Sequence, residues 1–237
     1  MVASIAASQD HVREAPVTRR PLVVVGGGEH ARVVIDAARA SGEWEVLGIV
    51  DESPAERTRS LLGVDHLGSD ASYLASVVDV PPDRRTAVVL GIGSVGDPAA
   101  RRAAAARYDV ARAGPWATLV HPSAWVSPAA TLGPGVVVLA CAVVNAGAEI
   151  GAHAIVNSQA VVEHDAVVGA FAHVGPGAVL GGAAHLGDGA LAGMGCLIRD
   201  HVTVGPEAVV GMGAAVTTDV PPGVTVIGAP ARPVGAR

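Results

Sequence analysis

A period of six residues runs through the second half of the chain without a slip in phase. Seventeen positions follow it from Val120 to Val216, and sixteen of them are Val, Ile or Leu. The residue two places earlier is usually Ala, and the residue that follows is often Gly. Helices repeat about every 3.6 residues and strands every two, so this period indicates neither alone. It indicates short strands joined by turns, with three hexads closing one coil. Stacked coils of this kind predict a parallel β-helix with a narrow core of Val and Ala.

The outward residues can be sorted, because equivalent residues of adjacent coils stack about 4.8 Å apart. Three faces result, and we call them the first, second and third face. The first carries Leu119, Val137, Ile155, His173, Leu191 and Val209; the second carries Trp125, Val143, Val161, Val179, Leu197 and Ala215; the third carries Thr131, Glu149, Val167, His185 and Thr203. The first two are largely apolar, and large apolar surfaces usually mark interfaces. We therefore predict a homotrimer that buries the first two faces and leaves the third in solvent. The alternative is that the apolar residues face only the chain's own loops.

Composition and charge exclude several classes of protein. Half of the residues are hydrophobic, yet the uncharged stretch 113–148 is interrupted by Pro and Gly and follows the six-residue period. This argues against a membrane-spanning helix. Residues 1–20 contain no apolar segment of the kind found in signal peptides. The net charge of −6 disfavours a nucleic-acid-binding surface. Two cysteines, Cys141 and Cys196, suit a reducing compartment, so we expect a cytoplasmic protein.

The front half of the chain alternates strands and helices. We expect buried strands at 22–25, 44–50 and 87–90, helices near 70–78 and 98–107, and a glycine turn at 26–28 that opens another helix. This alternation predicts a small Rossmann-like parallel α/β domain, with its ligand at the carboxyl ends of the strands. The predicted organisation is a disordered tail over 1–20, the α/β domain over 21–115, the β-helix over 116–220 and a C-terminal tail over 221–237.

The glycine turn is close to the fingerprint of dinucleotide-binding domains. Gly26, Gly28 and Ala31 keep its spacing, and Asp51 stands roughly where a ribose contact is expected. The motif brings phosphate to a helix N-terminus but does not name the nucleotide. The domain has about half the size of a full dinucleotide-binding fold. We therefore favour a nucleotide bound through its diphosphate and ribose over NAD.

Four short motifs occur in order along the chain. They are Gly-Gly-Gly-Glu-His-Ala at 26–31, His-Pro-Ser-Ala at 121–124, Glu-His-Asp at 163–165 and Gly-Ala-Pro-Ala-Arg at 228–232. Together with the hexad repeat, they resemble the NeuD/PglD-like sugar acetyltransferases over almost the whole chain from about residue 21. The resemblance implies a left-handed β-helix and an α/β domain that binds a UDP- or GDP-linked amino sugar. It also implies acetyl-CoA in a groove between adjacent β-helices, and it points to the same homotrimer.

Acetyl transfer from a thioester to an amine needs a base for the proton and donors for the thioester oxygen. Histidine suits the first task because its pKa is near neutral. His164 lies in a turn between the second and third faces, with Gly182 stacked above it. Asp165 and Glu163 are both candidates to orient the ring, and the resemblance places base and carboxylate at His164 and Asp165. No metal and no covalent enzyme intermediate are expected.

The resemblance and the stacking also assign the binding residues. The resemblance implies that His173 donates to the thioester carbonyl, and the stacked segments 193–195 and 211–213 expose backbone suited to a pantetheine chain. Cations are sparse in the β-helix, with Thr218 where relatives often carry Lys, so Arg232 is the expected phosphate contact. The predicted cofactor-binding residues are His173, Gly182, Met194, Gly195, Met212, Gly213 and Arg232. The predicted substrate-binding residues are Gly28, Glu29, His30, Asp51, Glu52, Gly68, Gly91 and Gly93.

Three other functions stay open at this point. A sugar O-acetyltransferase of the sialic-acid type would use the same scaffold with a hydroxyl acceptor. A non-catalytic nucleotide-sugar-binding protein would keep the pocket without the chemistry, which the Glu-His-Asp segment disfavours. A metal hydratase would need three converging histidines, and no two of the nine histidines lie five residues apart, the local spacing associated with that family.

Overall fold

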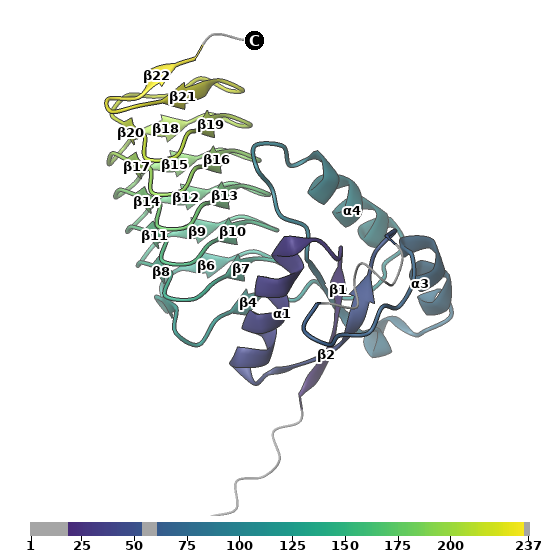
Figure 1. Cartoon of the computed structure of the whole chain (residues 1–237). Coiled ribbons are helices and arrows are strands. Elements are labelled where there is room, and N and C mark those ends of the chain that lie inside the picture. The colour runs from purple at the N-terminus through teal and green to yellow at the C-terminus, as the bar shows by residue number, and fades with distance from the viewer. Residues whose placement is uncertain (1–18, 54–60, 235–237) are drawn as a thin grey trace, which may run out of the picture.

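The computed structural model describes residues 19–53 and 61–234. Its N-terminal part is a parallel sheet in the order β2-β1-β3, with helices on both faces (Figure 1). The strands are β1 (Arg20–Val25), β2 (Trp44–Val50) and β3 (Ala87–Leu90). The helices are α1 (Glu29–Ser41), α3 (Asp70–Val77), α4 (Ala99–Val110) and the short 3-10 helix η1 (Pro82–Arg84). The predicted small parallel α/β domain is confirmed.

Alternate side chains of β1 point to opposite sides of the sheet, as strand geometry requires. Leu22 and Val24 pack in one core cluster with α1, and Val23 and Val25 pack in another with α3 and α4. The two clusters hold the strands so that their carboxyl ends form one edge. The glycine turn after β1 lies at that edge, where α/β domains bind ligands.

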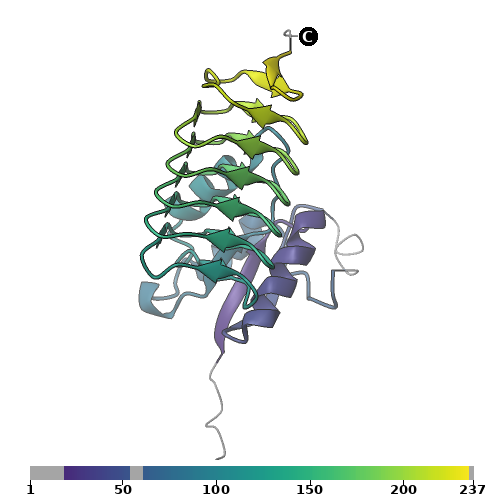
Figure 2. The same ribbon diagram turned by 90° about the vertical axis from the view of Figure 1, so that its left-hand side faces the viewer.

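A parallel β-helix of two-residue strands begins at Leu119 (Figures 1 and 2). The first sheet contains β4 (Leu119–Val120), β7 (Val137–Val138), β10 (Ile155–Val156), β13 (His173–Val174), β16 (Leu191–Ala192) and β19 (Val209–Val210). The second contains β5 (Trp125–Val126), β8 (Val143–Val144), β11 (Val161–Val162), β14 (Val179–Leu180), β17 (Leu197–Ile198) and β20 (Ala215–Val216). The third contains β6 (Thr131–Leu132), β9 (Glu149–Ile150), β12 (Val167–Val168), β15 (His185–Leu186) and β18 (Thr203–Val204). Ile155 pairs with both Val137 and His173, which confirms the predicted coil length.

The β-helix core is as narrow as its sequence predicts. The buried cluster runs from Val136 to Val226 and contains only Val, Ile, Leu, Ala and Cys196. Burial raises the pKa of the Cys196 thiol to about 12, so this cysteine is an inert core residue. The residue two places before each larger aliphatic residue is usually Ala, which leaves room for the side chains of the other two sheets.

The chain's own α/β domain covers the N-terminal half of the first face, which corrects the prediction that this half lies at a trimer interface. Leu119, Val137 and Ile155 are buried within the single chain, and Leu119 and Val137 share a core cluster with α1. The second face stays open: Trp125 is 59% exposed and Leu197 is 54% exposed. The sequence shows that both faces are apolar. It does not show which partner covers each one.

The end of the β-helix extends beyond the predicted boundary at residue 220. Strand β21 (Thr225–Ile227) pairs in parallel with β19, and β22 (Arg232–Pro233) folds back antiparallel on β21. This hairpin closes the first sheet, so much of the segment predicted as a tail is ordered. The predicted N-terminal tail lies outside the described residues except for Arg19 and Arg20, and β1 already begins at Arg20. Among the described helices, none is long and apolar enough to cross a membrane.

Candidate functional site

A cavity of about 240 Å³ lies at the carboxyl ends of β1 and β2. Its lining residues are Gly27, Gly28, Glu29, Arg32, Asp51, Ser53 and Leu61. Gly28 caps α1 without a side-chain hydrogen bond, which leaves backbone N–H groups at the start of a 13-residue helix. Such groups attract anions. Three predicted substrate-binding residues, Gly28, Glu29 and Asp51, therefore line one cavity.

Asp51 shapes this cavity by holding the backbone on both sides of it. Its two carboxylate oxygens accept hydrogen bonds from Gly27 N at 2.6 Å and Ser53 N at 2.7 Å. Desolvation would raise the pKa of Asp51, but these hydrogen bonds outweigh it and hold the pKa below its usual value. The carboxylate is therefore charged and already engaged by the turn that surrounds the cavity.

Four other predicted substrate-binding residues are not among the residues that line the cavity: Glu52, Gly68, Gly91 and Gly93. Glu52 accepts a hydrogen bond from Asp70 N at 3.0 Å, and Gly68 O accepts one from Asp51 N at 3.0 Å. A Cβ at Gly91 would collide with the backbone oxygen of the glycine turn, and one at Gly93 would lie 3.1 Å from His30 Cβ. Gly91 and Gly93 thus permit the close approach of the loop after β3 to the glycine turn.

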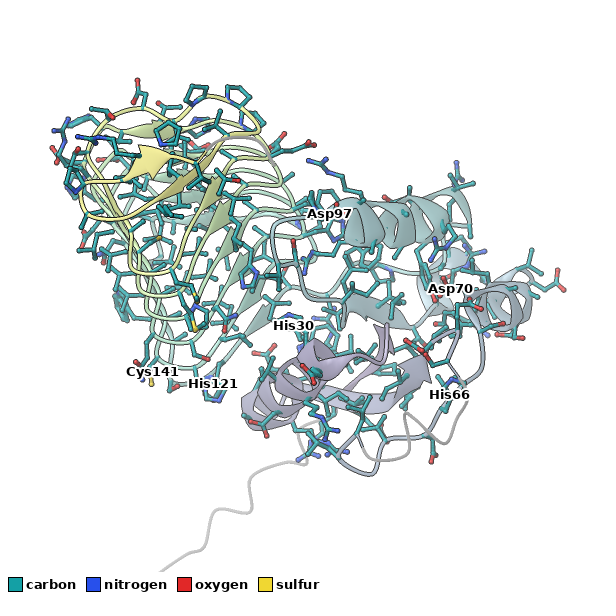
Figure 3. The ribbon with its side chains drawn as sticks, turned by 45° about the horizontal axis from the view of Figure 1, so that its top comes forward. His30, His66, Asp70, Asp97, His121 and Cys141 are labelled. Atoms are coloured by element: carbon teal, nitrogen blue, oxygen red, sulfur yellow. The ribbon has the colours of Figure 1, made fainter. Side chains whose placement is uncertain are left out.

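His30 lies between the two domains (Figure 3). Burial, with smaller contributions from Arg101 and His173, lowers the pKa of His30 to about 3, so its ring is neutral. Its ring centroid lies 6.4 Å from that of His173, and its Nε2 has no partner among the described residues. A buried ring nitrogen without a partner is costly, which marks His30 as a group that a ligand or water can satisfy.

His173 is engaged at both ring nitrogens. Its Nδ1 donates to Ser94 O at 2.7 Å, so the neutral ring carries its proton there. Nε2 then accepts from Asn157 Nδ2 at 3.0 Å. Burial lowers the pKa of His173, which favours this neutral form. In this arrangement the ring has no free N–H for a thioester oxygen, and the adjoining donor is the Asn157 amide, which sequence reasoning missed.

His164 and Asp165 form an exposed pair at the corner between the second and third sheets, which we call the 2–3 corner. His164 Nδ1 donates to Asp165 Oδ2 at 2.9 Å, and the His164 side chain is 64% exposed. The bond to Asp165 raises the pKa of His164. Because the carboxylate only accepts, the proton sits on Nδ1 and Nε2 is left as an acceptor. Glu163, the rival partner, is instead held by Asn145 Nδ2 at 3.0 Å.

Glycines in the adjacent coils make room for this pair. A Cβ at Gly182 would lie 2.7 Å from His164 Nε2, so the ring lies directly against Gly182, as the stacking predicted. Gly147, one coil the other way, makes room for the Asp165 carboxylate. The Gly182 N–H has no acceptor among the described residues, so a donor remains beside the open nitrogen of His164.

The remaining predicted cofactor-binding residues lie elsewhere on the β-helix. Met194 and Met212 are exposed at the corner between the first and second sheets, the 1–2 corner, together with Gly195 and Gly213. Arg232 lies on the terminal hairpin and donates to the neighbouring Ala231 O. The predicted set is therefore divided between the first face, which carries His173, two edges of the second face, and the end of the coil.

The His-Pro-Ser-Ala motif fastens the first coil to the second at the 1–2 corner. His121 Nδ1 accepts from Ser123 N at 3.1 Å and from Ser123 Oγ at 2.8 Å, and that hydroxyl oxygen accepts from Cys141 N at 3.1 Å. His121 and Cys141 lie at the N-terminal end of the β-helix (Figure 3). This arrangement gives the motif a structural role.

The comparisons with known proteins agree with this division into two parts. Residues 21–108 match the family model described as PglD N-terminal domain. A perosamine N-acetyltransferase from Caulobacter crescentus, in complex with CoA and GDP-perosamine, is 36% identical with a TM-score of 0.81, over 94% of this chain and 100% of that one. The acetyltransferase domain of PglB from Neisseria gonorrhoeae, in complex with acetyl coenzyme A, is 34% identical with a TM-score of 0.81, over 92% and 100%. The chain belongs to the hexapeptide-repeat sugar acetyltransferases.

Membership in the sugar acetyltransferases makes the chain an acyltransferase with a left-handed β-helix, as the motifs implied. A short match, 44% identical over 41 residues, links it to a Schizosaccharomyces pombe protein described as an acetyltransferase. The matched stretch spans 17% of this chain and only 20% of that protein. Within the described residues, no group of three His, Cys, Asp or Glu side chains is placed to hold a metal ion.

Proposed function

We propose that this sugar acetyltransferase transfers the acetyl group of acetyl-CoA to the amino group of a UDP- or GDP-linked amino sugar. The observation that carries the proposal is the His164–Asp165 pair, exposed on the β-helix with an open Nε2 beside Gly182. The cavity at the glycine turn has the helix N-terminus and the glycines expected of a nucleotide site. The relatives that bind CoA and GDP-perosamine support the same pair of substrates.

In the proposed mechanism, His164 Nε2 takes a proton from the attacking amine while Asp165 holds Nδ1–H. The amine nitrogen bonds to the thioester carbon, the C–S bond breaks, and the proton passes from His164 to the sulfur of CoA. In this mechanism the Gly182 N–H, which has no acceptor among the described residues, donates to the oxygen that becomes negative in the transition state. Both groups act from one corner of the coil.

We further propose a homotrimer in which each active site is shared between adjacent subunits. In the described contacts, the α/β domain touches the first face and the corner between the third and first sheets, the 3–1 corner. In a triangular coil the 2–3 corner lies opposite the first face, and the first sheet is the one beside the α/β domain (Figure 1). His164, between β11 and β12, is therefore on the far side of the coil from its own α/β domain. A neighbour packed on the apolar second face would bring His164 of one copy to the cavity of another.

The proposal is tested by assaying thiol release from acetyl-CoA with UDP- and GDP-linked amino sugars and with neuraminic acids. We expect turnover with a nucleotide-linked amino sugar and a trimer by light scattering. Turnover with neuraminic acids alone would favour O-acetylation. Binding of nucleotide sugars without thiol release would favour a non-catalytic protein. A monomer would overturn the shared site.

Blocking the cavity is expected to abolish sugar binding without harming the fold. Gly28 has an extended backbone with φ −75° and ψ −174°, which any residue adopts, and a Cβ there would meet nothing within 4 Å. In Gly28→Trp the indole would fill the cavity. We expect the Kd for the nucleotide sugar, measured by calorimetry, to rise at least about 100-fold, as expected when the binding volume itself is lost. The Kd for CoA and the melting temperature should stay unchanged.

The rate is expected to rise with pH as His164 loses its proton. Only the neutral ring accepts a proton, and the bond to Asp165 raises its pKa, so the acidic limb of kcat lies above the pH expected of a free histidine. In Asp165→Asn the pKa should fall back, and the limb should move to lower pH. The plateau rate should fall too, because the ring is less well oriented. If the acidic limb of the pH–rate profile stays at the same pH in Asp165→Asn, a group other than His164 is responsible for it.

A further inference from the structure

Arg101 is a buried cation that the proposed chemistry does not use. It lies on α4 and is only 1% exposed. Among the described residues no carboxylate forms an ion pair with it. Burial lowers its pKa to about 10, which leaves the guanidinium charged. A charge buried without a counter-ion is costly. The hydrogen bonds from Arg101 to carbonyl oxygens are therefore the interactions that offset the cost of burying its charge.

These contacts join the two domains through the loop after β3. Arg101 Nη1 donates to Ile92 O at 2.6 Å, and Nη2 donates to His153 O at the 3–1 corner. The loop is also held two residues further on, where Ser94 O accepts from His173 Nδ1 at 2.7 Å. One hydrogen bond from the α/β domain and one from the β-helix therefore hold a three-residue segment, 92–94.

The same segment forms the back of the glycine turn. The Ile92 side chain packs so closely on Gly26 that a Cβ there would collide with it, and Gly93 lies against His30. A shift of the loop would move the turn, and with it the N–H groups at the start of α1 that line the cavity. The position of the cavity relative to the β-helix thus depends on the loop.

The corner that receives Arg101 is built to hold it. His153 has a left-handed backbone, with φ 58°, and its ring stacks on Phe171 at 4.8 Å and meets Trp116 edge-on at 4.6 Å. Burial and the nearby Arg101 lower the pKa of His153 to about 4, so its ring stays neutral beside the cation. Gly135 makes room for this ring. The corner therefore offers Arg101 a fixed carbonyl oxygen.

We propose that Arg101 is a positioning residue, which clamps the 92–94 loop between the domains and so sets the nucleotide-sugar cavity in register with the β-helix. It touches no substrate and acts through the loop. The expected effect of Arg101 on turnover rests on the proposed function. The clamp itself can be measured by hydrogen exchange of the loop, which needs no substrate.

The adjacent Arg102 supplies a matched control. It also joins α4 to the β-helix, through Glu207 at 2.5 Å and through its guanidinium, which lies 5.9 Å from the centre of the Phe171 ring. It is partly exposed, and no hydrogen bond among the described residues joins it to the 92–94 loop or to His153. Exposed ion pairs contribute little. Arg102→Gln therefore removes one cation and its contacts with Glu207 and Phe171, while both hydrogen bonds of Arg101 stay in place.

The test compares Arg101→Met, Arg101→Lys and Arg102→Gln by steady-state kinetics and by hydrogen exchange of the 89–98 segment. In Arg101→Met we expect the KM for the nucleotide sugar to rise about tenfold or more, the effect of losing a charge-assisted hydrogen bond. The KM for acetyl-CoA should change little, and the loop should exchange faster. Arg101→Lys keeps the charge but cannot reach both carbonyls. Its KM for the nucleotide sugar and its loop exchange rate should therefore lie between those of the wild type and Arg101→Met. Arg102→Gln should match the wild type.

The outcomes separate the clamp from the proposed function. If the wild type turns over no nucleotide sugar, the proposed function fails, and the hydrogen-exchange comparison still decides the clamp. If Arg101→Met does not fold, Arg101→Lys carries the test. Wild-type loop exchange and wild-type KM in the soluble Arg101 variants would overturn the inference, and so would an equal effect in Arg102→Gln.

Discussion

His164→Ala is expected to lower kcat by about 10²–10⁴-fold, the usual contribution of a general base. The ring is oriented by Asp165 at 2.9 Å and presents an open Nε2, and no other described histidine stands against Gly182. Because the side chain is 64% exposed, its removal leaves the narrow core untouched. The KM values for both substrates should stay close to those of the wild type, since the ring acts on the proton and not on binding.

His185→Ala is the control for this variant. His185 is an exposed histidine in β15, on the third face, and has no part in the proposed site. Thiol release should continue at the wild-type rate, and light scattering should show the same assembly in both variants. A His164→Ala enzyme with wild-type kcat, or an equal loss in His185→Ala, would assign the base to another group.

The sequence predicts the β-helix almost residue by residue because its signal is local and repeated. Each hexad supplies its own strand, turn and core residue. One atypical residue, such as Ala192, therefore does not shift the register, because the neighbouring hexads fix it. The prediction stops at Val216, where Pro221 and Pro222 interrupt the period, and the hairpin that closes the coil was therefore missed. The same stacking placed His164 against Gly182 correctly.

Contacts between the domains could not be predicted in this way. Arg101 and His153 are separated by 52 residues, and no periodicity relates them. An apolar outward column is equally compatible with a partner subunit and with the chain's own α/β domain, which is why the N-terminal half of the first face was misassigned. The state of His173 depends on Ser94 and Asn157 together, and only the folded arrangement brings Ser94 to its ring.

Two inactive variants are expected to restore activity when they are mixed in one trimer. His164→Ala damages the base and leaves the cavity whole, whereas Gly28→Trp fills the cavity and leaves the base whole. If one subunit supplies the cavity and its neighbour the base, random mixing gives roughly a quarter of the sites two intact halves. The activity per site should then approach that fraction of the wild type after unfolding and refolding together, or after co-expression with two affinity tags.

The design separates a shared site from a site within one chain. If each chain used its own His164, every site in the mixture would carry one lesion, and the activity would stay at the level of the two variants. A mixture of His164→Ala with Asp165→Asn serves as the control, because both lesions lie at the same 2–3 corner and no arrangement of subunits repairs them. Recovery in the first mixture alone is the result that the proposed trimer predicts, because the α/β domain packs on the first face of its own chain and His164 lies at the opposite corner.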